Sequence, residues 1–133
     1  MEDDWKREDD WFWEGNIQQS VVDYMKTEEG FTILSPGHPV PAEQGLEILA
    51  ERSKQGVTIS RLVVVRGWPS PLYTRGSMTG QPRTTRPEVV ARGWMAQAVL
   101  DIALGRGGDP DLDLSLAIPA MASYVRYIQR LRW

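Results

Sequence analysis

The chain has 133 residues, of which 41% are hydrophobic and 25% are charged, a composition typical of one globular domain. It has no cysteine and a single histidine, His38, which excludes disulfide bonds, cysteine nucleophiles and multi-histidine zinc sites. No apolar run approaches the roughly 18 residues of a membrane span, and the first ten residues have no signal-peptide core. We therefore expect a soluble cytoplasmic protein that does not act at a membrane.

The formal net charge of -3 hides an uneven distribution along the chain. Residues 1–29 carry ten acids and three bases, whereas residues 52–92 carry eight bases and one acid. Such segregation indicates either an anionic partner for the basic segment or pairing of that segment with the acidic part of the chain. Both alternatives stay open at this point.

The chain begins with an acidic leader, residues 1–10, which has no periodic apolar face. A single domain is expected over residues 11–133, and the large rings of Trp11, Phe12 and Trp13 are expected to pack against it. From residue 14 to about 29, apolar side chains recur at spacings of three and four, which predicts a helix that ends at Gly30. Residues 31–34 then predict a short strand.

The next two predicted elements form a hairpin. Residues 45–51 alternate, with Glu47, Leu49 and Glu51 on one side and Ile48 and Ala50 on the other. Residues 54–56 suit a turn, and residues 58–66 are rich in β-branched side chains. This pattern is typical of two antiparallel strands joined by a tight turn.

A long loop and three further elements complete the chain. The 21 residues from 67 to 87 contain four prolines and three glycines, which predicts a loop of functional interest. A helix is predicted over residues 87–104, a strand over 112–118 and an amphipathic helix after Pro119. The order is α-β-β-β-α-β-α, and the helix before the last strand allows a parallel crossover, so we expect an α/β fold with a mixed sheet flanked by helices.

Five short motifs lie along the chain from Trp13 onward, in the same order as in the proteins that they resemble. They resemble motifs of uncharacterised prokaryotic members of the PD-(D/E)XK nuclease superfamily, the restriction-endonuclease-like proteins. Their patterns in those proteins are W-x-E-G-N-x-Q, G-x-D-I-x-A, E-V-K-G-aromatic-P-S, Q-A-R-x-W and A-F-P. The corresponding segments here are Trp13–Gln18, Gly45–Ala50, Val64–Ser70, Val90–Trp94 and Ala117–Pro119.

The resemblance implies a restriction-endonuclease-like αβββαβ core and, in active relatives, Mg²⁺-dependent cleavage of phosphodiesters. Those relatives hold Mg²⁺ with an acid on the second strand and an acid two residues before a lysine on the third strand. A glutamate on the first helix and a glutamine on the second often assist. Relatives usually continue into another strand after the last helix. That strand is expected to be missing here, so either the chain is truncated at Trp133 or something else, such as a partner or a homodimer, fills the edge.

This sequence departs from the implied site at most positions. Glu14 and Gln18 match the residues of the first helix, and Glu47 stands where relatives have aspartate. Val64 replaces the third-strand acid, Arg66 the lysine and Val90 the assisting glutamine. We expect Val64 and Arg66 to lie on the face turned toward Glu47 and the first helix, with Arg66 paired to Glu47 or Glu14 where Mg²⁺ would sit.

The expected function is therefore that of a catalytically inactive nuclease-fold protein that binds nucleic acid or a protein within an assembly. It would need no cofactor. The alternative is a metal-dependent DNA endonuclease with an atypical site, in which Glu47 and Glu14 would bind Mg²⁺. Nucleic-acid binding would be weak and sequence-independent, or else the long loop closes on the domain itself. The candidate binding residues are Trp68, Tyr73, Arg75, Arg83 and Arg86.

Overall fold

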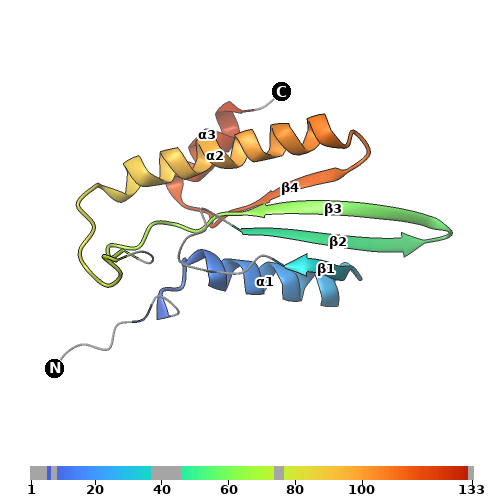
Figure 1. The fold of residues 1–133 in the computed structure, drawn as a ribbon, viewed down its shortest axis with the longest axis horizontal. Helices are drawn as coiled ribbons and strands as arrows, with labels where there is room; N and C mark the ends of the chain where they lie inside the picture. Colours follow the sequence, from blue (N-terminus) through green and yellow to red (C-terminus); the bar gives the residue numbers. More distant parts are fainter. Residues whose placement is uncertain (1–5, 7–8, 37–45, 74–76, 132–133) are drawn as a thin grey trace.

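The computed structural model describes residue 6 and residues 9–36, 46–73 and 77–131. It is an α/β fold with a four-stranded mixed open sheet and three helices, in the predicted order (Figure 1). The elements are α1 (Glu14–Thr27), β1 (Thr32–Pro36), β2 (Leu46–Lys54), β3 (Val57–Val65), α2 (Pro87–Gly108), β4 (Asp113–Ala117) and α3 (Ala122–Arg130). His38 lies outside the described residues.

The strands lie in the order β1-β2-β3-β4. β2 pairs antiparallel with both β1 and β3, and β4 pairs parallel with β3. The parallel pair requires a crossover connection, and α2 provides it, as the sequence predicts. β1 and β4 are consequently the two edges of this sheet.

A two-residue turn joins β2 to β3. Lys54 pairs with Val57, and the intervening Gln55 and Gly56 both have positive φ, at 54° and 80°. Positive φ at both central residues is the geometry of a type I′ turn, whose twist matches that of the paired strands. Along β2 the predicted alternation is confirmed, because Ile48 and Ala50 are fully buried while Glu47 is exposed.

The two faces of the sheet are covered by different helices (Figure 1). α1 packs on the face that presents Ile48, Val63 and Val65, and Met25 and Phe31 complete that core. On the other face, α2 and α3 enclose a second core around Ala91, Met95 and Tyr124. Side chains of successive β3 residues point to opposite faces, so this arrangement decides which helix each residue meets.

Two expectations about local structure are wrong. Trp13 is buried at 8% exposure and Phe12 is partly buried, but Trp11 does not pack against the domain, because its side chain is 73% exposed. α2 does not end at residue 104. A Cβ at Gly105 would lie 3.2 Å from Leu114, so this glycine lets the helix approach β4 rather than stopping it.

Within the part of the chain that the structure describes, no helix has both the length and the apolar character needed to cross a membrane.

Candidate functional site

Arg66 lies directly after β3 and is almost fully buried, at 2% exposure. Its amide donates a 3.0 Å hydrogen bond to the carbonyl of Ala117, which extends the β3–β4 pairing by one residue. Nη2 donates at 2.7 Å to Oδ2 of Asp101 on α2, and Nη1 donates at 3.0 Å to the carbonyl of Val65. Nε is buried and has no hydrogen-bond partner within the described part of the chain. The guanidinium is thus fixed in place by two partners.

The sheet register places Val64 directly opposite Glu47, so these two side chains share a face, as expected. Arg66 follows by alternation on that same face, which α2 covers. The expectation that this face is turned toward the first helix is wrong, because α1 packs against Val63 and Val65 on the opposite face.

The expected ion partner of Arg66 is also wrong. Arg66 pairs with Asp101, and among the described residues no ion pair joins it to Glu14 or to the exposed Glu47. The physical reason is the crossover: α2 passes over β3 and brings its own carboxylate to the guanidinium. Asp101 belongs to none of the five motifs. The signal that could have found it is an acid between Leu100 and Ile102 in an otherwise apolar stretch of helix.

Tyr124 of α3 is a second residue of this cluster that sequence reasoning did not single out. Its side chain is fully buried, and its hydroxyl donates a 2.7 Å hydrogen bond to the carbonyl of Gly67. Burial raises the pKa of the Tyr124 hydroxyl; the positive charge of Arg66 opposes this rise and the carboxylate of Glu14 adds to it. Arg66 and Glu14 therefore both lie close enough to act electrostatically on this hydroxyl.

Glu14 and Gln18 occupy successive turns at the start of α1 and are buried, at 6% and 7% exposure. The first turn of a helix favours a carboxylate because of the backbone dipole. Gly67 lets α1 come this close to the end of β3. A Cβ at Gly67 would lie 2.3 Å from the carbonyl oxygen of Phe12, which also accepts a 3.0 Å hydrogen bond from the amide of Trp68.

The residues of this cluster do not fit a Mg²⁺ site. Mg²⁺ needs oxygen ligands in near-octahedral geometry, usually from carboxylates and water. Val64 is fully buried and offers no oxygen, and the carboxylate of Asp101 is already bound by Arg66. Val90 of α2 offers no amide. Among the described residues, no group of three or more His, Cys, Asp or Glu side chains is placed to hold a metal ion.

The long loop after β3 closes on itself. Leu72 and Pro82 form an isolated bridge, and the amide of Tyr73 donates at 2.9 Å to the carbonyl of Gln81. The side chain of Arg83 donates through Nε to the carbonyl of Ser70 at 2.8 Å and through Nη2 to the carbonyl of Leu72 at 3.3 Å. Its guanidinium also lies 5.0 Å from the centre of the Tyr73 ring. Arg83 therefore holds the loop together.

The other loop residues expected to bind nucleic acid are divided between interior and surface. Trp68 is partly buried, in an edge-to-face contact with Tyr124 at 5.2 Å. The Tyr73 hydroxyl lies 2.9 Å from Thr84, and hydrogen bonding with Thr84 lowers the pKa of Tyr73. Arg86 is exposed directly before α2, and Arg75 lies outside the described residues. The described part of the loop thus uses most of its candidate residues internally.

Comparisons of this chain with models of known protein families, with curated proteins and with solved structures find no match.

Proposed function

We propose that this protein is a catalytically inactive member of the restriction-endonuclease-like PD-(D/E)XK group that serves as a binding component of an assembly. The main support for this proposal is the 2.7 Å ion pair between Arg66 and Asp101 beside the buried Val64. The motif order and the α-β-β-β-α-β-α topology support the family part of the proposal.

The charges of the cluster support the loss of catalysis. A working site needs clustered carboxylates to attract Mg²⁺, which stabilises charge on the phosphate and activates the attacking water. Here a fixed guanidinium occupies the lysine position, and unlike lysine it cannot give up its proton. It also neutralises Asp101, the carboxylate closest to it. Opposite the exposed Glu47, the acid position is filled by the apolar side chain of Val64.

A protein partner is favoured over nucleic acid by the way the long loop uses its side chains. Arg83 is bound to Ser70 and Leu72, and Trp68 packs on Tyr124, so neither side chain is available for stacking or phosphate contacts. Nucleic acid remains the second candidate, because Arg86 and Arg92 are both exposed near the start of α2. Two exposed arginines are consistent with weak binding that depends strongly on salt.

Titration calorimetry with Mn²⁺ tests the inactive site. The wild-type chain should give no binding heat, whereas the repaired variant Val64→Glu with Arg66→Lys should bind Mn²⁺, because it restores the acid and the lysine opposite Glu47. Val57→Glu with Arg61→Lys is the matched control, since it places the same residue types elsewhere on β3 and should not bind. Mn²⁺ binding by the wild type that Glu47→Ala abolishes would instead support the atypical nuclease.

A further inference from the structure

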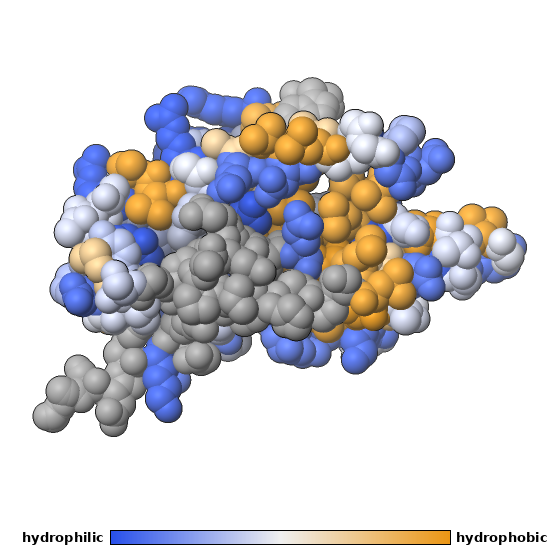
Figure 2. All heavy atoms as spheres, viewed as in Figure 1, coloured by the Kyte–Doolittle hydropathy of each residue, from blue (hydrophilic) through white to orange (hydrophobic). Residues whose placement is uncertain are grey.

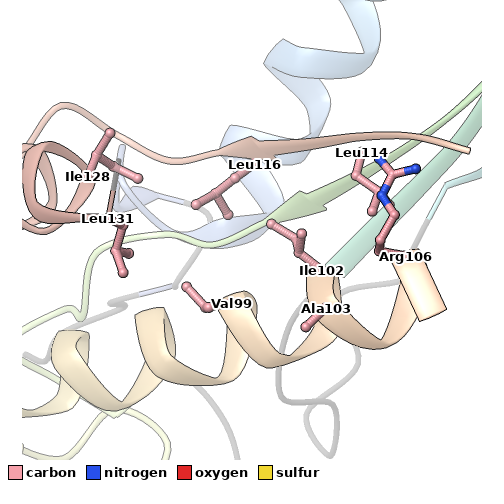
Figure 3. A pocket seen from close by; sticks show the side chains of 8 residues that line it. All are labelled: Val99, Ile102, Ala103, Arg106, Leu114, Leu116, Ile128 and Leu131. Atoms are coloured by element: carbon pink, nitrogen blue, oxygen red, sulfur yellow. The ribbon is translucent and has the colours of Figure 1, made fainter. Parts of the chain in front are cut away.

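An apolar groove lies between α2, β4 and α3 (Figure 3). It encloses about 650 Å³, and its walls include Val99 and Ile102 of α2, Leu114 and Leu116 of β4, and Ile128 and Leu131 at α3. A second hollow of about 580 Å³ shares Val99 and Leu131, so the two hollows are neighbours along α2. Volumes of this size are typical of sites that bury a ligand or a large side chain.

Of the described residues that line these two hollows, the charged ones are all arginines. Arg106 lies at one end, next to Leu114 in Figure 3, and its Nη1 donates a 2.5 Å hydrogen bond to the carbonyl of Pro110. Arg92 and Arg130 line the other hollow, and no acid from the described part of the chain lines either one. An apolar floor with cationic ends suits an occupant that combines a large apolar side chain with carboxylates.

The start of the chain has this complementary character. Trp11 is 73% exposed, although an aromatic ring of this size gains most when it is buried. Asp9 beside it is exposed, and residues 1–10 carry six acids and two bases. A tryptophan at the end of an acidic segment complements the apolar lining and the arginines of the groove.

We propose that the groove binds the segment around Trp11 of a second copy of this chain, with Trp11 on the apolar floor and the leader acids toward Arg106, Arg92 and Arg130. This deepens the proposed binding function by naming the partner, and it does not depend on whether the Arg66 site is inactive. Trp is among the residues that most often dominate binding energy when they fill an apolar pocket.

A second copy is favoured over the same chain because the sheet separates the two surfaces. Trp11 precedes α1, and α1 lies on the opposite face of the sheet from α2 (Figure 1). The carbonyl of Phe12, the next residue, is bound to the amide of Trp68, which fixes where the segment leaves the domain. Exchange between two copies fills both grooves and gives a closed two-fold dimer.

The face around α2 shows the apolar surface that such a dimer would cover. In Figure 2, hydrophobic side chains gather along α2 and over the neighbouring sheet, between hydrophilic ones. Leu100 and Leu104 of α2 do not line the groove but add to the exposed apolar surface of this helix, at 56% and 65% exposure. Exposed apolar patches with polar rims mark interaction sites more often than they mark free surface.

Sedimentation velocity of the full chain over a range of concentrations tests the proposal. We expect a monomer–dimer equilibrium, with Trp11→Ala and Ile128→Asp each weakening the dimer at least tenfold. Tyr24→Ala is the matched control, because Tyr24 is also an exposed aromatic residue, on α1 and remote from the groove, and it should leave the equilibrium unchanged. Circular dichroism confirms that each variant folds.

A charge exchange tests the orientation of the segment. Arg106→Glu with Arg130→Glu should weaken the dimer, Glu8→Lys with Asp9→Lys should do the same, and the two pairs combined should restore association. A monomer at every concentration, or a dimer that survives both Trp11→Ala and Ile128→Asp, would overturn the proposal. Metal binding at the Arg66 site would leave these results unchanged, so the two proposals fail separately.

Discussion

The hydroxyl of Tyr124 donates a 2.7 Å hydrogen bond to the carbonyl oxygen of Gly67, and this bond joins α3 to the first residues of the long loop. Tyr124 is fully buried, so Tyr124→Phe leaves that carbonyl without its partner inside the domain. We expect a loss of about 1–2 kcal/mol in the free energy of unfolding, measured by urea denaturation. Tyr127→Phe, on the partly exposed side of the same helix, should change it by less than about 0.5 kcal/mol.

Because of this same hydroxyl, we expect the protein to lose stability at alkaline pH. Burial raises the pKa of Tyr124 in the folded state, so the folded protein keeps this proton to higher pH than the unfolded chain does. The contribution of this proton to the free energy of unfolding is therefore fully present below the ordinary tyrosine pKa of about 10. As pH rises above that value the contribution is lost, and the free energy of unfolding falls by up to about 1.4 kcal/mol per pH unit. Unfolding measured across this range should show the slope in the wild type and in Tyr127→Phe, and Tyr124→Phe should remove it.

The ion pair between Arg66 and Asp101 should contribute more to the free energy of unfolding than the more exposed pair between Arg61 and Asp113. Asp101→Asn leaves the buried guanidinium without its counter-charge, and because the side chain of Asp101 is 31% exposed we expect a loss of about 2 kcal/mol rather than the larger cost of a fully buried pair. Asp113→Asn removes a partner of the more exposed Arg61 and should cost less than about 1 kcal/mol. Equal losses for the two variants would show that Arg66 does not depend on Asp101.

Gly67 should tolerate no side chain. A Cβ there would meet backbone atoms, the oxygen of Phe12 at 2.3 Å and the nitrogen of Glu14 at 2.7 Å, which a rotamer change cannot relieve. Gly67→Ala should therefore cost about 3 kcal/mol or more in chemical denaturation. Gly93→Ala, where the added Cβ meets nothing within 4 Å in the middle of α2, should stabilise the protein by up to about 1 kcal/mol.

Much of the fold follows from local pattern. The period of two in β2, the turn at residues 54–56 and the apolar spacing of three and four in α1 are local properties, and the structure confirms all three elements. The local pattern did not predict where α2 ends, because Gly105 suits both a helix end and a close approach to Leu114. Only the packing of α2 on β4 decides between them.

The candidate functional site could be predicted from the sequence only in part. The register of Val64 opposite Glu47 is a consequence of strand pairing and was predictable. The partner of Arg66 was not, because Asp101 lies 35 positions further along the chain and reaches Arg66 only through the crossover. Tyr124 likewise joins the cluster through the placement of α3, which no local pattern specifies.

The central claim is that this cluster does not catalyse phosphodiester cleavage. The most direct measurement incubates the purified chain with plasmid DNA, single-stranded DNA or RNA in millimolar Mg²⁺ or Mn²⁺, beside the Glu47→Ala and Glu14→Ala variants. We predict that any cleavage in the wild-type sample equals that in both variants, because Val64 offers no oxygen ligand and the carboxylate of Asp101 is bound by Arg66. Metal-dependent cleavage that the wild type shows and Glu47→Ala abolishes would contradict it.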